Sequence, residues 1–338
     1  MQRRDPLLFA LGLGATILTL GVVVLGAFVR LTDAGLGCPD WPGCYGQLDV
    51  PRTTEQIERA NQAFPERPVE ITKAWIEMIH RYVAGILGLM IAAIAVIAWR
   101  RRHLGVRVGL PFALLALVIF QSLLGMWTVT LLLKPAIVTA HLIGGLTTLT
   151  LLFLFTLTHA PRLPSMAAPP AVGRLAGFAL GVLIIQIVLG GWTSTNYAAL
   201  ACPDFPTCQQ QWWPDMDFGT GFTPWQEGIG VDYEHGILES PARTAIHKVH
   251  RLGAIVAALV IGGLALACLV ARRPPALRAA GATILVVLAA QLALGIGNVV
   301  YHLPLWMATA HNGGAALLLL SVVGALYGIQ QHSRPRPA

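Results

Sequence analysis

Long apolar stretches separated by polar loops run through the chain from end to end. The first covers residues 7–29, which are 23 residues without an ionisable side chain. That is more than the roughly 20 residues that a helix needs to cross about 30 Å of hydrocarbon, and it is too long for the hydrophobic region of a signal peptide. The pattern predicts eight transmembrane helices, at residues 7–29, 74–99, 108–133, 136–158, 171–193, 244–271, 279–301 and 305–328.

The chain also contains an internal duplication. The paired segments are 79–85 with 249–255, 121–127 with 291–297 and 139–145 with 309–314, each at an offset of 170 residues, and 26–44 with 190–208 at an offset of 164. Four spans per repeat preserve orientation, so the halves run parallel and are related by an axis along the membrane normal.

We therefore predict an all-α integral membrane protein whose eight transmembrane helices form two parallel, pseudo-symmetric four-helix bundles. The N-terminal half comprises residues 1–165 with an outer loop at 30–73. The C-terminal half comprises residues 166–338 with an outer loop at 194–243.

Charge distribution sets the expected orientation. Only 12% of the residues are charged and 55% are hydrophobic, whereas a soluble domain is about a quarter charged. One side of the predicted membrane carries a single acid, Asp5, and most of the arginines: Arg3, Arg4, Arg100, Arg101, Arg102, Arg107, Arg162, Arg174, Arg272, Arg273, Arg278, Arg334 and Arg336. Clustered arginine marks the cytoplasmic side. We expect a multi-pass protein of the inner (cytoplasmic) cell membrane with both termini in the cytoplasm, and no nucleic-acid partner despite the net charge of +7.

Four histidines occupy matched positions in the two halves. His80 and His141 lie about six residues inside the outer ends of their spans, roughly 9 Å deep at 1.5 Å per residue, and His250 and His311 repeat this arrangement. Paired imidazoles at one depth in a four-helix bundle are suited to hold a haem iron from both sides. A hydrogen bond to a neighbouring helix is the alternative use of such a histidine, and zinc is disfavoured because each half is two ligands short. The sequence predicts one haem site per half.

Charged residues next to these histidines are further candidates. Arg81 and Arg251 each follow a histidine and are suited either to pair with haem propionates or to reach the lipid headgroups. Glu77 lies three residues before His80 on the same helix face, whereas the second half has His247 at that position. A carboxylate at this depth either acts on the substrate, by stabilising positive charge or moving a proton, or pairs with Lys73 or Arg81 at the helix end.

Paired cysteines occur in both outer loops. Cys38 and Cys44 frame the segment PDWPG, and Cys202 and Cys208 frame PDFPT. Outside the cytoplasm disulfides persist, so a bridge within each pair is expected. Whether the first bridge is a structural staple or a redox-active disulfide is left open by the sequence.

At these residues the chain resembles the haem A synthase family, the bacterial and mitochondrial membrane enzymes that convert haem O to haem A. The resemblance covers nearly the whole length and rests on the E-x-x-H-R of Glu77–Arg81, the TAH of His141, the HR of His250 and the TAH of His311. The paired loop cysteines resemble those of the cysteine-containing bacterial branch.

The resemblance implies an oxidoreductase that oxidises the C8 methyl group of haem O to a formyl group by successive hydroxylation. Haem O would bind near His80 and His141, with Glu77 as the catalytic carboxylate, and a haem b would be held by His250 and His311. It further implies haem O synthase, an electron donor such as ferredoxin and cytochrome oxidase assembly as partners. The oligomeric state, including a homo-oligomer, is left open.

Two other classes of protein are consistent with the histidine pairs alone. A dihaem b-type electron-transfer cytochrome is the first alternative, but its haems are commonly stacked at two depths, and here both pairs lie near the outer face. A haem transporter or chaperone is the second, and it needs a route between compartments. The presence of Glu77 in one half only favours chemistry over electron transfer.

Overall fold

A computed structural model describes residues 5–161, 164–225, 230–270 and 272–333. Among these residues there are helices but no strands beyond two isolated bridges. The helices are α1 (Pro6–Leu31), α2 (Thr54–Ala63), α3 (Ile71–Arg100), η1 (Arg102–Leu104), α4 (Gly109–Thr130), α5 (Pro135–His159), α6 (Pro170–Thr195), α7 (Phe218–Gly221), α8 (Ser240–Leu269), α9 (Pro275–Val300) and α10 (Leu305–Ser333).

Eight of the described helices are long and apolar enough to cross a membrane, which confirms the prediction of eight spans. Helix ends differ on both sides of the membrane. On the inner side α9 begins at Pro275 rather than 279, and α10 extends to Ser333 rather than 328. Helices α3 and α8 begin three and four residues before the predicted 74 and 244, in polar sequence that hydropathy does not detect. Helix α4 ends at Thr130 rather than 133, because apolar Leu132 and Leu133 adopt positive φ angles in a tight turn. The predicted end of the sixth span, residue 271, lies outside the described residues.

Local sequence signals explain where the helices begin. The carboxylate of Asp5 accepts from the backbone N–H groups of Leu7 and Leu8 and caps α1. Thr53 and Gln56 form a capping box that starts α2 in the first outer loop. Five of the long helices have a proline in their first turn, where the missing N–H costs nothing: α1, α5, α6, α8 and α9.

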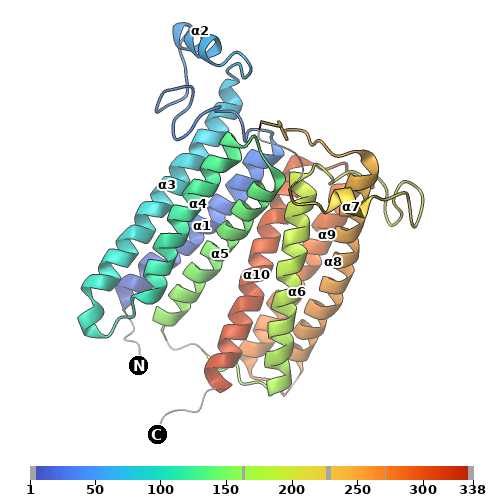
Figure 1. Cartoon of the computed structure of the whole chain (residues 1–338). Helices are drawn as coiled ribbons and strands as arrows, with labels where there is room; N and C mark the ends of the chain where they lie inside the picture. Colours follow the sequence, from blue (N-terminus) through green and yellow to red (C-terminus); the bar gives the residue numbers. More distant parts are fainter. Residues whose placement is uncertain (1–4, 162–163, 226–229, 271, 334–338) are drawn as a thin grey trace.

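The helices pack in two groups that lie side by side (Figure 1). In the first group α1 contacts α3 and α5, and α4 contacts the same two helices; in the second α6 contacts α8 and α10, and α9 contacts the same two. Helices α1, α5, α6 and α10 carry the contacts between the groups. Leu146 and Leu149 of α5 belong to the hydrophobic core of the second group, so that core extends across this seam onto α5.

Short structural details repeat between the halves. Cis peptide bonds at Trp41–Pro42 and Phe205–Pro206 lie inside the two cysteine loops. The tight turn after α4 recurs after α9, with positive φ angles at His302 and Leu303. These matched turns agree with a duplication, whereas the division at residue 165 remains a prediction.

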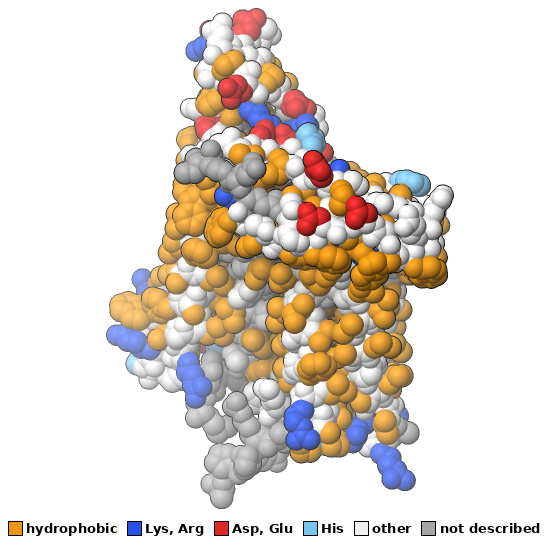
Figure 2. Space-filling view, turned by 45° about the vertical axis from the view of Figure 1, so that its right-hand side comes forward, with side chains coloured by type: hydrophobic (Ala, Val, Ile, Leu, Met, Phe, Trp, Pro, Cys, Tyr) orange, Lys and Arg blue, Asp and Glu red, His pale blue; other side chains and the backbone are white. Residues whose placement is uncertain are grey.

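Charge separates along the helix axes. The start of α1 and the end of α10 lie at the same end of the molecule (Figure 1). Figure 2 shows acidic side chains over the outer loops, a broad hydrophobic band around the helices and basic side chains at the opposite end. The arginines at positions 3, 4, 162, 334 and 336 lie outside the described residues.

Candidate functional site

The four histidines lie on the helices that the sequence predicts. His80 is on α3 and His141 on α5, and His250 on α8 and His311 on α10 repeat the arrangement. Within each half the two imidazoles are close enough to interact electrostatically. Helices α3 and α5 do not pack directly against each other, so His80 and His141 stand on diagonally opposed helices of the first group. The same holds for His250 on α8 and His311 on α10.

Each histidine packs against a glycine on the preceding long helix. A Cβ added at Gly26 would lie 3.1 Å from Cε1 of His80, and one at Gly190 would lie 3.1 Å from Cε1 of His250. The corresponding distances are 3.5 Å from Gly125 to His141 and 3.0 Å from Gly295 to His311. The absence of a side chain at all four positions leaves room for a ring beside a close helix backbone.

Three of the four histidines have a buried ring nitrogen without a polar partner in the described part of the chain. Nδ1 of His80, His141 and His311 is buried and makes no hydrogen bond among the described residues. Unpaired polar atoms in a packed interior are costly, so an additional partner is expected there. Paired neutral imidazoles, with glycines that leave space for a flat macrocycle, fit a haem iron held by His80 with His141 and by His250 with His311.

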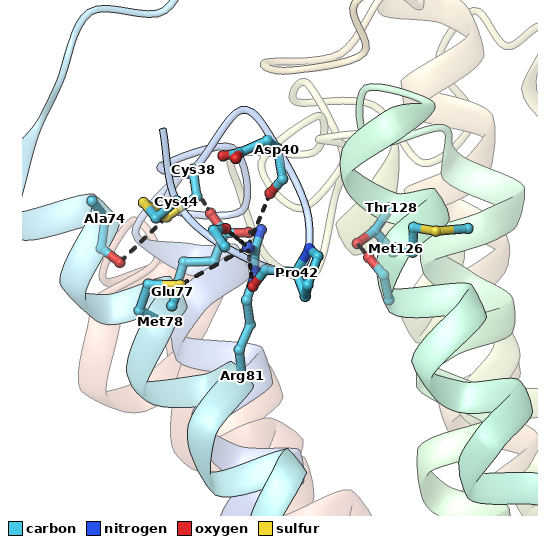
Figure 3. A network of polar contacts seen from close by, with 12 residues as sticks. Cys38, Asp40, Pro42, Cys44, Ala74, Glu77, Met78, Arg81, Met126 and Thr128 are labelled. Carbon is cyan, nitrogen blue, oxygen red and sulfur yellow. Dashed lines mark hydrogen bonds and ion pairs between the residues drawn. A yellow bond between two sulfur atoms is a disulfide. The ribbon is translucent and has the colours of Figure 1, made fainter. Parts of the chain in front are cut away.

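Glu77 and Arg81 anchor the first cysteine loop to α3 (Figure 3). Glu77 is buried, its Oε2 accepts from the backbone N–H of Cys38 at 2.8 Å, and its Oε1 pairs with Nη2 of Arg81 at 2.5 Å. Nη1 of Arg81 donates to the backbone carbonyls of Asp40 at 3.0 Å and Gly43 at 2.5 Å. The carboxylate thus connects the helix that carries His80 with the disulfide loop above it.

The second half reproduces this anchor with a neutral residue. Nδ1 of His247 lies 3.1 Å from the backbone N of Cys202, and Nε2 of His247 lies 3.2 Å from Nε of Arg251. A neutral imidazole accepts at one of these two nitrogens. Arg251 also donates to the carbonyls of Cys202, Asp204 and Thr207. The two loops are therefore held alike, but only the first half has a carboxylate at this position.

These contacts bear on the predicted roles of the charged residues. Arg81 and Arg251 are engaged by loop carbonyls and by the side chain one turn before them. Their pairing with haem propionates stays a prediction. Glu77 makes the helix-end pair with Arg81 that was one of its two expected uses, and it adds a bond to Cys38 that the sequence does not reveal.

The predicted disulfides are both present. Cys38 bonds to Cys44 and Cys202 bonds to Cys208, which confirms the expected pairing. In each loop the second cysteine is followed by a short bridge, Cys44 with Gln47 and Cys208 with Gln211. Each loop is thus closed both covalently and by backbone hydrogen bonds.

A polar cavity of about 150 Å³ lies where the two outer loops meet. Its lining includes Gly37 and Tyr45, which flank the first disulfide, and Glu234 from the second loop. Arg67, also in the lining, pairs with both Asp232 and Glu234 and so ties the loops together. Burial alone would lower the pKa of Arg67, but the two carboxylates more than offset this and raise it.

Two glutamines near the histidines were not among the predicted site residues. Gln186 on α6 and Gln291 on α9 each lie within hydrogen-bond distance of a histidine of the second half. Gln291 falls in the repeated segment 291–297, and Gln186 is a polar side chain in an otherwise apolar span. Both signals were visible, but only the helix packing shows what the amides contact.

Comparison with known proteins places the whole chain in context. A protein family described as "Cytochrome oxidase assembly protein" matches residues 10–323. The protein named Heme A synthase from Shewanella oneidensis is 45% identical over 314 residues, which cover 92% of this chain and 93% of that protein. Proteins of the same name from Sphingopyxis alaskensis and Methylobacterium radiotolerans are 28% and 30% identical, over 94% and 91% of this chain and 90% and 86% of their own lengths.

Proposed function

The chain belongs to the family of cytochrome oxidase assembly proteins, and from this membership we propose that it is a haem A synthase. It is a multi-pass membrane oxidoreductase that acts on haem O and makes haem A for cytochrome oxidase. The observation that carries the proposal is an asymmetry between matched halves. Both contain a histidine pair, but only the first places a buried carboxylate, Glu77, one helical turn from a histidine.

We assign the substrate to the first half. Haem O binds between His80 and His141, and oxidation of its C8 methyl group through successive hydroxylation yields the formyl group. Oxidation of the methyl carbon develops positive charge at that carbon, so the site needs a group that stabilises positive charge or takes up a proton. Among the ionisable residues near His80 in the sequence, Glu77 is the one that the second half does not repeat. This difference supports the assignment.

Glu77 is held in place by its partners. The N–H of Cys38 and the guanidinium of Arg81 fix both carboxylate oxygens, so the charge does not need to reorient as the substrate becomes positive. Preorganised charge of this kind is the largest single contribution in many enzymes. Arg81 keeps three loop carbonyls as partners, and it therefore stays in position when the carboxylate takes up a proton.

Protons have a polar route from this site. Gly37 and Tyr45, next to the two cysteines of the first loop, line the cavity between the outer loops. Several ionisable side chains share this cavity: Asp33, Glu66, Arg67, Glu70, Lys73 and Glu234. We assign proton release to this outer side.

The second half holds the cofactor in this proposal. A haem b bound by His250 and His311 would supply electron transfer between an external donor and the substrate half. Ferredoxin is the class of donor that we expect, haem O synthase supplies the substrate, and cytochrome oxidase receives the product. Both termini face the cytoplasm, because arginines gather at that end of the helices.

Pigment analysis of the purified protein tests the function. The full chain, produced together with haem O synthase, is extracted and its haems are separated by chromatography. We expect haem A, or hydroxylated haem O, beside haem b. Two equivalents of haem b and no oxidised haem O would instead identify a dihaem electron-transfer cytochrome, the alternative that the names of the relatives do not favour.

A further inference from the structure

The two halves differ in what holds their histidines. Each histidine of the second half lies within hydrogen-bond distance of a glutamine amide. In the first half the amide of Gln121 packs against Gly144, one turn after His141, but its nitrogen makes no hydrogen bond among the described residues. Nε2 of Gln186 is 3.1 Å from Nδ1 of His250 and 3.0 Å from the backbone carbonyl of the same residue. Nε2 of Gln291 is 3.4 Å from Nε2 of His311.

The side-chain amide of Gln186 packs against the backbone of Gly253. A Cβ at Gly253, one turn after His250, would collide with the amide oxygen of Gln186, so glycine at this position makes room for the amide. That amide oxygen is buried and has no hydrogen-bond partner among the described residues. A half-turn of the amide exchanges its two ends, so the side chain can either donate to Nδ1 or accept a proton carried there.

The first half lacks this arrangement. Val22 stands at the position of Gln186, and Val83 at the position of Gly253, by the offsets of the duplication. Nδ1 of His80 is consequently buried without a hydrogen-bond partner in the described part of the chain. Gln121 corresponds to Gln291, and its amide nitrogen has no hydrogen-bond partner among the described residues. Nδ1 of His141 is also without a partner there.

A hydrogen bond to the far ring nitrogen fixes the orientation of a ligating histidine and raises its basicity. We propose that Gln186 is a positioning residue that locks His250 onto its haem, so that the second half retains a permanent haem while the unlocked first half lets its haem exchange. The inference rests on the proposed function, since a substrate must enter and leave whereas a cofactor must stay. Gln291 differs from Gln186, because its amide nitrogen faces Nε2 of His311 and Nδ1 of His311 has no hydrogen-bond partner among the described residues.

The test follows haem retention rather than catalysis. The purified full chain and the variant Gln186→Leu are mixed with an excess of apomyoglobin, and the transfer of haem b is followed by the Soret band. Loss of such a hydrogen bond typically costs 10–100-fold in metal affinity, so haem b should leave about 10–100-fold faster. The midpoint potential of the haem b that remains should shift to more positive values, because its ligand is less basic.

A matched variant and a reciprocal exchange complete the design. Gln121→Leu removes the first-half glutamine whose amide nitrogen is unpaired, and haem b retention should not change. The double variant Val22→Gln/Val83→Gly introduces the corresponding glutamine and glycine beside His80, and haem loss from the first half should become slower. Equal haem b retention and potential in Gln186→Leu and the parent would overturn the inference, as would a double variant without effect. Haem A formation reports separately on the proposed function, so the two can fail independently.

Discussion

Replacement of Glu77 by glutamine is the sharpest test of how the site works. The variant Glu77→Gln keeps an oxygen that can accept from the N–H of Cys38, but it removes the negative charge that pairs with Arg81. The side chain keeps its size, so the helix and the loop above it should keep their positions. The substitution therefore separates the charge of this residue from its role as an anchor.

The cost to folding follows from the contacts. Glu77→Gln loses one charge-assisted bond, worth about 1.5–3 kcal/mol when buried, but Arg81 retains its loop carbonyls. The loss should therefore stay below the about 3–5 kcal/mol of a stranded buried charge. Glu77→Leu also leaves the N–H of Cys38 unpaired and should lose a further amount of about 1–3 kcal/mol.

The effect on catalysis should be much larger. Removal of one preorganised electrostatic group typically slows an enzyme by about 10²–10³-fold, so Glu77→Gln should form haem A at that reduced rate. Haem A per protein is measured by extraction and chromatography, and stability by thermal unfolding in detergent. The haem b spectrum, which reports on the other half, should not change.

The duplicated fold provides a matched control. His247 makes the same two kinds of contact in the second half, to the N–H of Cys202 and to Arg251. His247→Gln should lower stability slightly and leave haem A formation close to that of the parent. The reasoning is refuted if Glu77→Gln makes haem A at the parental rate. It is also refuted if both variants lose haem A equally, since loop anchoring rather than charge would then be responsible.

Three further predictions follow from other contacts. Gly190→Val places two methyl groups against the ring of His250, which leaves 3.1 Å for a Cβ, and should abolish the haem b absorbance of the purified protein. The double variant Cys38→Ser/Cys44→Ser should lower the free energy of unfolding by about 2–4 kcal/mol yet keep the haem b spectrum, because the loop retains its anchor to α3. Asp5→Ala should cost about 1–2 kcal/mol through loss of the α1 cap, seen as a lower midpoint of thermal unfolding.

Each of these predictions has its own control. Gly125→Ala should be tolerated, since 3.5 Å is ordinary contact, and an intact haem b signal in Gly190→Val would refute the packing argument. Loss of haem b in the double cysteine variant would show that the first disulfide supports both halves.

The Asp5 variant also predicts a pH dependence. Burial alone would raise the pKa of Asp5, but Arg101 and the N–H groups of Leu8 and Leu7 more than compensate and lower it. A carboxyl whose pKa is lowered by folding stabilises the protein above its ordinary value of 3.8 and loses this contribution as the pH falls through the lowered pKa. Asp5→Ala should therefore show a weaker acid dependence of stability than the parent, and an identical dependence would contradict the assignment.

Sequence patterns were sufficient for the helices but not for their ends. Eight spans follow from apolar length alone, since every backbone group in a bilayer must bond within its own helix. The first turns of α3 and α8 were missed because they are polar, and the end of α4 was misplaced because Leu132 and Leu133 are apolar residues in a turn. Hydropathy reports the solvent around a residue, whereas these boundaries depend on backbone conformation.

The candidate site divides in the same way. The four histidines and both cysteine pairs were found because duplication repeats residue types at fixed offsets, and Glu77 was found because the second half has His247 at the matching position. Their partners distant in the sequence were not found, since Gln186 reaches His250 across 64 positions and Glu77 reaches Cys38 across 39. A periodic pattern contains information on one helix at a time, and contacts between helices depend on how their faces meet.

By itself the sequence determined that this chain crosses a membrane eight times, that its halves are related and that each half carries a histidine pair. Only the tertiary structure decided that a buried carboxylate holds the first disulfide loop and that glutamines reach the histidines of one half alone. The physical reason is that burial of apolar length acts residue by residue along the chain. Hydrogen bonds between helices need donor and acceptor within about 3 Å, which packing alone sets.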